Sequence, residues 1–249
     1  MGFPIQGAVA LVTGANRGIG EALVNALFAA GARKVYAGAR QVSDLTDLQA
    51  RHGEKLVAVT LDVTQADDVA KAVELAGDVS LLINNAGVVS HIGNSFTDQK
   101  WLEAGQTEMD VNYFGTLRMM MAFAPVLARN GGGAIANIGS VASLINFPAF
   151  ISYSASKAAT HSVTQAARLL LASQGTQVYG IYPGPIDTRM TQDLPFEKTS
   201  PATAATAMLN DIQNGVEEIF PDPMAKVFGD LWVSQPKALE NHVAAMLAG

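Results

Sequence analysis

Residues 8–20 read AVALVTGANRGIG, and this stretch decides the fold of the chain. Its first part, Ala8–Thr13, is a short apolar run that predicts a buried β-strand. Glycines follow at positions 14, 18 and 20, and a helical pattern runs over Ile19–Ala30. Glycine permits positive φ and close backbone approach, and a helix N-terminus offers free N–H groups to an anion. The stretch therefore predicts a strand, a phosphate-binding loop and a helix in succession.

The glycine spacing is G-x-x-x-G-x-G and not the commoner G-x-G-x-x-G of dinucleotide-binding loops. Glycine clusters also occur in ordinary strand–helix turns, and that alternative stays open on this motif alone. The position at the first strand–helix junction favours pyrophosphate binding, because the helix dipole points there. Gly31, just past the helix, is expected to cap its C-terminus.

The rest of the chain alternates short apolar runs with helical patterns. Most runs do not alternate apolar and polar residues, as expected for strands covered on both faces. Such an order predicts an α/β, Rossmann-like fold: a doubly wound parallel sheet of six or seven strands with helices on both faces. The expected strands are Ala8–Thr13, Lys34–Gly38, Lys55–Leu61, Val79–Ile83, Ala134–Gly139 and Gln177–Tyr182. The expected helices are Ile19–Ala30, Leu45–His52, Ala66–Leu75, Met109–Arg129 and Tyr153–Ser173.

The C-terminal quarter has a different composition. Thr191–Ala205 is rich in Thr, Pro and small residues, which favours a mobile segment, and we expect a substrate-covering segment near residues 189–215. Glu217–Phe220 is a candidate seventh strand. Met224–Leu247 is expected to hold two helical pieces broken near Pro236.

Composition excludes several classes of protein. With 49% hydrophobic and 15% charged residues, the 249-residue chain supports a buried core, and residues 1–249 are expected to form a single domain. A net charge of -6 argues against a nucleic-acid partner. The absence of cysteine excludes disulfides, thiolate nucleophiles and cysteine-based metal sites. No apolar run reaches the length of a membrane span and no signal sequence is evident, so we expect no membrane association and a cytoplasmic location.

The end of the second expected strand bears on the choice of dinucleotide. In a dinucleotide site, an acidic residue here would bond the 2′-hydroxyl of the adenosine ribose. Ala39 and Arg40 stand in its place, and a guanidinium pairs with a 2′-phosphate through a charge-assisted fork. Arg17, in the glycine loop, can reach the same phosphate. These residues predict NADP(H) as the cofactor, with two solvated surface arginines as the alternative.

A possible proton-transfer site lies further along the chain. Tyr153 and Lys157 are four residues apart and share one helix face. A free phenol has a pKa of about 10, and a nearby ammonium is expected to lower it towards neutrality. Ser140 ends the fifth expected strand, at the sheet edge where open α/β sheets bind ligands. Tyr and Lys at this spacing are usually only part of a helix surface, so it is the combination with Ser140 that indicates chemistry.

Six motifs now appear in order, and together they identify a family. They are TGANRGIG at residues 13–20, NNAG at 84–87, DVNYFG around Asn112, Ser140, YSASK at 153–157 and PGPIDT at 183–188. From Gly7 to about Thr188, the chain resembles the single-domain branch, roughly 250 residues long, of the short-chain dehydrogenase/reductase family. No catalytic position departs from the family pattern.

The resemblance implies a role for each catalytic residue. Tyr153 would be the general acid/base that protonates the carbonyl oxygen during reduction. Lys157 would lower the pKa of that phenol and bind the nicotinamide ribose. Ser140 would position and polarise the carbonyl, and Asn112 would hold a water in a proton relay that reaches Lys157.

The resemblance also implies that the domain binds NADP(H) along the carboxyl edge of its sheet. Asp62 and Val63 would contact adenine, and the PGPIDT segment would flank the nicotinamide. The expected cofactor-binding residues are Gly14, Asn16, Arg17, Gly18, Ile19, Arg40, Asp62, Val63, Asn85, Ala86, Gly87, Tyr153, Lys157, Pro183, Gly184, Ile186 and Thr188.

The implied activity is the NADP-dependent interconversion of a ketone or aldehyde and its alcohol. Three segments are expected around the nicotinamide: Val88–Phe96, Leu144–Phe150 and Met190–Phe196. They contain no Lys or Arg, so we expect a neutral, apolar substrate. The resemblance further implies a homodimer or homotetramer in which the long helices Met109–Arg129 and Tyr153–Ser173 pair across an interface.

Two rival functions remain. A lyase, epimerase or dehydratase can use the same tyrosine with a retained cofactor, but such relatives usually carry a larger substrate domain. A non-catalytic NADP-sensing protein typically lacks the tyrosine or the lysine, and both are present here. No metal site is expected, because the four histidines show no metal spacing, and without a G-x-S-x-G motif a serine hydrolase is not expected.

Overall fold

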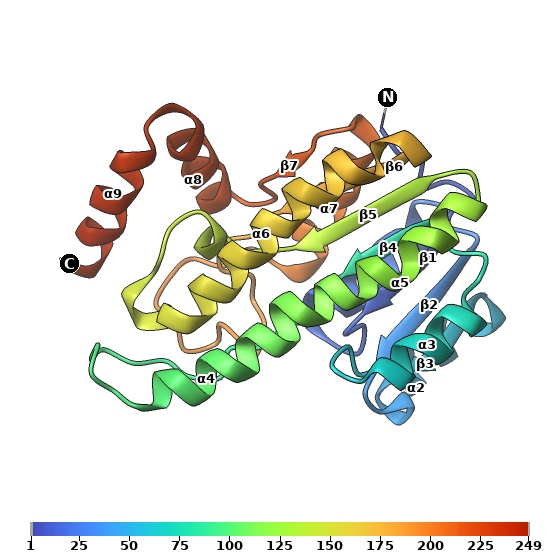
Figure 1. Ribbon diagram of the computed structural model, residues 1–249, viewed down its shortest axis with the longest axis horizontal. Coiled ribbons are helices and arrows are strands. Elements are labelled where there is room, and N and C mark those ends of the chain that lie inside the picture. The colour runs from blue at the N-terminus through green and yellow to red at the C-terminus, as the bar shows by residue number, and fades with distance from the viewer. Residues whose placement is uncertain (1, 249) are drawn as a thin grey trace.

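The computed structural model describes residues 2–248 and contains one parallel sheet of seven strands in the order β3-β2-β1-β4-β5-β6-β7 (Figure 1). All six expected strands are present, and the candidate seventh strand is confirmed as a short edge strand. The fold is therefore the Rossmann-like doubly wound sheet that the sequence predicts. The strands are β1 Val9–Thr13, β2 Lys34–Ala39, β3 Leu56–Thr60, β4 Leu81–Asn84, β5 Gly133–Ile138, β6 Thr176–Ile181 and β7 Glu218–Ile219.

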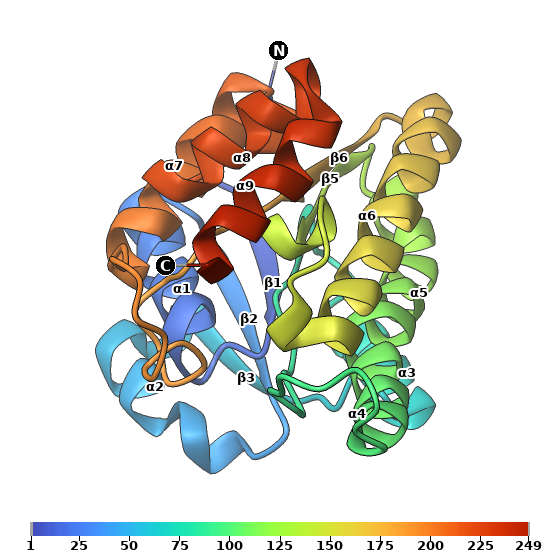
Figure 2. The same cartoon turned by 90° about the vertical axis from the view of Figure 1, so that its left-hand side faces the viewer.

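Helices cover both faces of the sheet, as Figure 2 shows. Alternate side chains of β1 explain the two layers: Ala10 and Val12 join one buried cluster with α1 and α7, while Val9 and Leu11 join the other with α3 and α5. Because both faces of each central strand are buried, these strands need apolar residues at every position. The helices are α1 Gly18–Ala29, α2 Thr46–His52, α3 Ala66–Leu75, α4 Lys100–Glu108, α5 Thr116–Arg129, α6 Ile151–Leu171, α7 Pro201–Asn214, α8 Pro223–Ser234 and α9 Pro236–Ala248.

The strand order reverses at β1, which lies between β2 and β4. The chain leaves β1 towards one side of the sheet and β4 towards the other, so a crevice forms outside their carboxyl ends. Every loop that carries a predicted site residue leaves the sheet at this edge. Gly31 has φ +86° directly after α1, which confirms the predicted C-terminal cap.

The helix expected over Met109–Arg129 begins nine residues earlier, at Lys100. Its middle part, Met109–Gly115, is a π-helix that joins α4 to α5 in one long rod (Figure 1). The start at Lys100 was not predicted because Gly105 and its polar neighbours interrupt the apolar pattern of a helix. π-turns inside helices are rare and often accompany functional sites.

Part of the segment expected to be irregular is helical. Helix α7 begins at Pro201, so the last residues of Thr191–Ala205 and most of 189–215 belong to a regular helix that packs on α1. The Ser200 hydroxyl accepts the N–H of Thr203 at 3.1 Å and caps the helix. Proline in the first turn together with a serine cap is a strong helix start, which outweighs the small-residue composition.

The C-terminal helices α8 and α9 break before Pro236, as predicted. They pack on the chain after β5, where Phe147 stacks on Phe228 with ring centroids 5.7 Å apart. Among residues 2–248, no helix combines the length and the apolar character needed to cross a bilayer.

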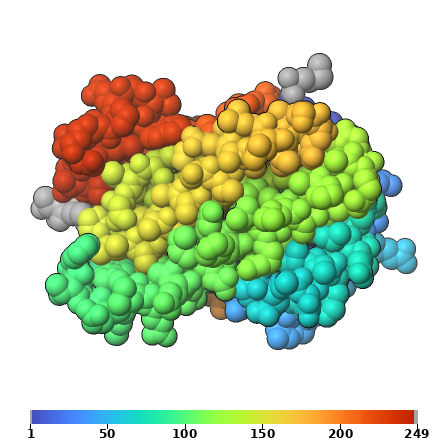
Figure 3. Space-filling view, in the orientation of Figure 1, coloured from blue at the N-terminus to red at the C-terminus, as the bar shows by residue number. Residues whose placement is uncertain are grey.

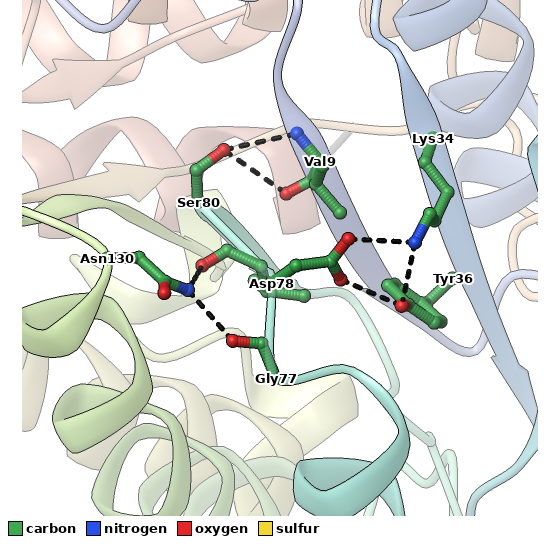
Figure 4. Close-up of polar contacts among 8 residues, drawn as sticks. Val9, Lys34, Tyr36, Gly77, Asp78, Ser80 and Asn130 are labelled. Atoms are coloured by element: carbon green, nitrogen blue, oxygen red, sulfur yellow. Dashed lines mark hydrogen bonds and ion pairs between the residues drawn. The ribbon is translucent and has the colours of Figure 1, made fainter.

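A polar cluster holds the amino ends of the central strands (Figure 4). Asp78, just before β4, accepts a hydrogen bond from Lys34 at 2.7 Å and another from the Tyr36 hydroxyl at 2.7 Å. The Nδ2 of Asn130 donates to the carbonyls of Gly77 and Val79. This cluster joins β2, β4 and the loop after α5 at the edge opposite the predicted site.

Candidate active site

The glycine loop has the geometry of an anion cradle. Gly14 and Gly18 have φ of +63° and +56°, where only glycine is free of strain. A Cβ on Gly14 would lie 3.1 Å from the Ala86 Cα, and one on Gly18 would lie 3.1 Å from the Thr188 Cγ2. No side chain caps the N-terminus of α1 at Arg17, which leaves its N–H groups free for a ligand. The loop thus fits a pyrophosphate.

The chain after β4 is fixed to this loop by a set of hydrogen bonds. The Thr13 hydroxyl accepts the N–H groups of Asn85 and Ala86, each at 2.9 Å. The Nδ2 of Asn85 donates to the carbonyls of Thr13 at 2.9 Å and Gly14 at 3.0 Å. Thr13 was not singled out from the sequence. The signal available was a hydroxyl at the carboxyl end of an otherwise apolar strand.

Asn112 lies in the π-helix and holds the chain after Gly87. Its Oδ1 accepts the Val88 N–H at 2.8 Å, and its Nδ2 donates to the Val88 carbonyl at 3.0 Å. A Cβ on Gly87 would lie 3.2 Å from the Asn112 Oδ1 and 3.4 Å from the Lys157 Nζ. Gly87, Asn112 and Lys157 therefore meet in one place, although they come from three separate motifs.

Ser140 and Tyr153 come together beside this group. Ser140 follows β5, and its hydroxyl accepts the Ala142 N–H at 3.1 Å in a capping box with Ser143. Tyr153 stands in the first turn of α6 and is half-buried. Lys157 is almost fully buried, and its Nζ lies 5.7 Å from the centroid of the Tyr153 ring.

Burial controls the protonation of both groups. Burial raises the pKa of Tyr153 to about 12; the hydrogen bond with Ser140 lowers it in part, and the charge of Glu108 raises it further. Burial alone lowers the pKa of Lys157 to about 8. The Lys157 ammonium donates to the Ile138 carbonyl at 2.8 Å, and its lowering of the pKa of Tyr153 stays a prediction.

The residues expected around adenosine lie along the ends of β2 and β3. Arg17 and Arg40 are exposed, and neither forms an ion pair within residues 2–248. Ala39 is buried at the end of β2. Asn16 donates to the Asp44 carboxylate at 3.1 Å, which ties the glycine loop to the chain after β2.

Asp62 and Val63 follow β3 and face different surroundings. The Asp62 carboxylate accepts the N–H and the hydroxyl of Thr64 at 2.9 and 2.7 Å. Val63 is buried, and its side chain packs against Gly115, where a Cβ would come within 2.6 Å of it. Its backbone is therefore the part that remains for a cofactor.

The PGPIDT segment is held by a residue far along the chain. The Gly184 N–H donates to the Asp222 Oδ2 at 2.8 Å, while Oδ1 of the same carboxylate accepts the Ala225 N–H and caps α8. Asp222 is buried, which raises its pKa. No sequence motif predicted a role for Asp222. The Asp-Pro pair at the start of α8 was its only sequence signal.

Some residues of the expected substrate-lining segments lie near Tyr153, and others are buried in the core. Phe150 lies beside Tyr153, with ring centroids 6.4 Å apart. The Gly93 N–H donates to the Ala149 carbonyl at 3.2 Å, which joins two of the three segments. Phe147 instead packs into the cluster under α8 and α9, so part of the expected lining is structural.

The third segment is tied down at its far end. Ile186 and Thr199 form a parallel bridge, in which Asp187 donates to Thr199 and Thr199 donates to Pro185 at 2.9 and 3.2 Å. Residues 189–198 therefore form a closed loop whose two ends are held together near Gly18. Over the described part of the chain, no three His, Asp or Glu side chains gather as metal ligands.

Comparison with known proteins assigns the family. Residues 8–198 match the family described as short chain dehydrogenase. An uncharacterized oxidoreductase of Staphylococcus epidermidis is 35% identical over 196 residues, which cover 77% of this chain and 84% of that protein. Another from Staphylococcus saprophyticus is 33% identical over 220 residues, covering 84% and 92%.

Solved structures agree with this assignment. A short chain dehydrogenase from Burkholderia cenocepacia in complex with NADP is 41% identical, covers 96% of this chain and 98% of that chain, and superposes with a TM-score of 0.89. A 3-ketoacyl-(acyl-carrier-protein) reductase from Brucella melitensis complexed with NADH is 25% identical, covers 87% and 97%, and has a TM-score of 0.79. The chain belongs to the short-chain dehydrogenase family and is an oxidoreductase with its Rossmann-like fold.

Proposed function

We propose that this protein is an NADP-dependent reductase that interconverts a ketone or aldehyde and its alcohol. One observation carries the proposal: the Ser140 hydroxyl, the Tyr153 phenol and the Lys157 ammonium come together beside Gly87. In reduction, the Tyr153 Oη gives its proton to the carbonyl oxygen, and in oxidation it takes that proton back. Ser140 holds the same oxygen by a hydrogen bond, which fixes the carbonyl beside the proton donor.

The buried Lys157 would position the cofactor beside Tyr153. Its ammonium is held within the site by the Ile138 carbonyl and stands beside Gly87 and Asn112. NADP(H) supplies the hydride when it is bound. The free N-terminus of α1, Gly14 and Gly18 would hold its pyrophosphate, and Lys157 would hold the nicotinamide ribose. Asn85 and Asp222 support this cradle by fixing the Gly14 and Gly184 backbones.

Preference for NADP(H) over NAD(H) is supported by charge. Arg17 and Arg40 are exposed at the adenosine end, and Ala39 offers no carboxylate to a ribose 2′-hydroxyl. A charge-assisted hydrogen bond to a 2′-phosphate contributes about 1.5–3 kcal/mol, which is roughly tenfold or more in affinity. The Burkholderia relative was solved with NADP and the Brucella relative with NADH, so the family accommodates both cofactors.

A neutral, apolar substrate is supported by the side chains nearest Tyr153. Phe150 stands beside it, and Ile92, Phe96 and Met190 are exposed in the segments expected around the nicotinamide. Residues 88–96, 144–150 and 190–196 contain no Lys or Arg, and an obligatory anionic substrate would need such a clamp. Aromatic or aliphatic ketones and aldehydes fit this lining best.

The test is a substrate screen with both cofactors. Purified protein is mixed with NADPH or NADH and a panel of neutral ketones, aldehydes and matched keto acids, and the absorbance of the reduced nicotinamide is followed. The proposal predicts turnover of neutral carbonyls with NADPH, with weaker rates for NADH and for keto acids. Strong, selective turnover of carboxylated or phosphorylated ketones would overturn the substrate class, and no turnover of any carbonyl or alcohol would overturn the function.

A homodimer or homotetramer is part of the same proposal. Helices α5 and α6 lie side by side on one broad face of the molecule (Figure 3). This face carries exposed large apolar side chains, and Ala155, Ala158 and Ala166 on α6 are small enough for close helix approach, whereas Ala167 is buried. Light scattering measures the assembly directly. The exposed large apolar residues of α4, the π-helix, α5 and α6 are Leu102, Phe114, Met121, Leu169 and Leu170.

A further inference from the structure

A buried carboxyl group stands beside the proposed proton donor and has no part in the reaction described above. Glu108 is the last residue of α4, and its side chain has 0% exposure. Its Oε1 accepts the N–H of Ser90 at 2.7 Å. Its Oε2 has no hydrogen-bond partner among residues 2–248. Acidic side chains are almost never fully buried without full pairing, so this one calls for a functional reason.

Helix α4, which ends at Glu108, packs against the first turn of α6. Helices α4 and α6 pack closely here, because a Cβ on Gly105 would lie 3.4 Å from the Ser152 Cβ (Figure 1). Ser152 is the neighbour of Tyr153, and its own buried hydroxyl also has no partner in the described structure. After burial, the charge of Glu108 is a further cause that raises the pKa of Tyr153.

The other contact of Glu108 reaches the loop after β4. Glu108 and Asn112 are four residues apart on the same rod, and both hold backbone of this loop. Asn112 pairs with Val88 through both polar groups of its amide, and Glu108 pairs with Ser90. The two side chains together fix the chain that runs past Gly87, which is the chain beside the Lys157 ammonium.

We propose that Glu108 is a positioning residue of this active site, which holds the Ser90 backbone with one oxygen and biases Tyr153 towards its protonated form with its charge. The inference rests on the proposed role of Tyr153 as proton donor. Reduction of a carbonyl needs the phenol, whereas oxidation of an alcohol needs the phenolate. A fixed negative charge nearby disfavours the phenolate, so at a given pH Glu108 holds more of Tyr153 in the protonated form that donates to a carbonyl.

Few other titratable groups lie on the elements packed around Glu108. On α6 the titratable neighbours are Tyr153 and Lys157, and the Lys157 ammonium is held by a carbonyl. In the loop after β4, His91 pairs with Asp98 at 3.0 Å. On the π-helix that follows Glu108, Asp110 is exposed and lies 3.7 Å from Arg118.

The decisive variant is Glu108→Gln. Its amide oxygen still accepts the Ser90 N–H, so the loop contact survives while the charge is lost. The pH limb of turnover assigned to Tyr153 should move to lower pH by about half a unit, in both directions of the reaction. Below that limb, alcohol oxidation with NADP⁺ should then run about threefold faster than in the wild type. The position of a limb does not depend on how much enzyme is active, so a less stable variant remains informative.

Two further variants distinguish the loss of the Glu108 charge from the loss of its contact with Ser90. Glu103→Gln removes an exposed charge from the same helix and should leave the pH profile unchanged. Glu108→Ala removes the Ser90 contact as well, and should lower kcat in addition to moving the limb. Coincident profiles for wild type and Glu108→Gln, or a limb that moves to higher pH, would overturn the role of Glu108. If the wild type itself turns over no carbonyl or alcohol, or if Tyr153→Phe retains full activity, the proposed function fails and this inference fails with it.

Discussion

Thr13 and Asn85 exchange hydrogen bonds across the carboxyl ends of β1 and β4. The Thr13 hydroxyl accepts the Asn85 N–H at 2.9 Å, and the Asn85 side-chain amide returns a bond to the Thr13 carbonyl at 2.9 Å. These two strands border the reversal of strand order, so this pair holds the two walls of the cofactor crevice at a fixed separation. Neither side chain needs to touch a ligand to matter for binding.

Replacing Thr13 by Val should therefore weaken both folding and cofactor binding. Valine keeps the shape but leaves the N–H groups of Asn85 and Ala86 without a partner, which costs about 1–3 kcal/mol. For a chain of this size, each kcal/mol lowers Tm by about 2–4 °C. Thermal unfolding with and without NADPH measures both effects, and Thr13→Ser is the matched control. Equal Tm for the Val and Ser variants would contradict this reading of Thr13.

Tyr153→Phe should abolish turnover while NADPH still binds. Only the proton donor is removed, and loss of a general acid commonly costs about 10²–10⁴ in rate. Lys157→Ala should harm both turnover and NADPH affinity, since Lys157 stands where the cofactor ribose is expected. Single-turnover rates and NADPH fluorescence titrations separate the two effects. Tyr113→Phe is the control for loss of a phenol elsewhere, and substantial activity in Tyr153→Phe would refute the assignment.

Substitutions at the end of β2 should shift the preference from NADPH towards NADH. Ala39→Asp is expected to weaken NADPH by repulsion of the 2′-phosphate and to improve NADH through a new hydrogen bond. Arg40→Ala should lower NADPH affinity alone, and the effect should shrink with added salt, because the site is exposed. The measurement is the ratio of kcat/KM for the two cofactors, which is insensitive to the amount of folded protein. Arg129→Ala serves as the control, and an unchanged ratio in both variants would refute the prediction.

The loop that closes over the nicotinamide is expected to be residues 189–198, which is shorter than the segment 189–215 expected from composition. Residues 189–198 should exchange amide hydrogens quickly in the free protein and slowly with NADPH bound, because the loop lies against Gly18 and Thr188. The Asp187 amide, bonded to Thr199, should be protected in both states. Hydrogen exchange by mass spectrometry tests this. Strong and equal protection of 189–198 in both states would argue against a lid.

Stability in acid should depend on Asp78. Burial raises the pKa of this carboxyl, but the hydrogen bonds from Lys34 and Tyr36 outweigh that effect and leave the pKa below its usual value. A lowered folded-state pKa gives stability that is present above the unfolded-state pKa, near 4, and is lost as pH falls through the folded value.

The Asp78 pair is partly exposed, with side-chain exposures of 32% for Lys34 and 40% for Asp78, so its contribution is only about 1 kcal/mol. Asp78→Asn should therefore unfold more easily than wild type at pH 7, and the two proteins should converge as the pH falls through the folded-state pKa of Asp78. Urea unfolding at several pH values gives the comparison. A difference that persists or grows in acid would show that the effect is not electrostatic.

The sequence predicted the strands because their signal is local. Each central strand must be apolar on both faces, and the glycines and motif residues mark the turns at the carboxyl edge. What could not be predicted depends on side chains meeting across the fold. Glu108 lies in a polar stretch that is typical of a solvated helix surface, yet it is fully buried.

The hydrogen bond of Lys157 shows the same limit. Spacing placed Tyr153 and Lys157 on one helix face, and this is correct, but the ammonium donates to the Ile138 carbonyl. That partner lies 19 residues earlier in the chain, and no helical spacing encodes it. Asp222 is a similar case, because its contact with Gly184 joins residues 38 positions apart.

The Asp222 carboxylate makes the C-terminal helices part of the support of the predicted cofactor site. One oxygen holds the Gly184 backbone and the other starts α8, so a single side chain couples the dinucleotide crevice to the C-terminal helical pair. The family match stops at residue 198, before this carboxylate. The position of the Gly184 backbone therefore depends on a residue outside the matched part of the chain.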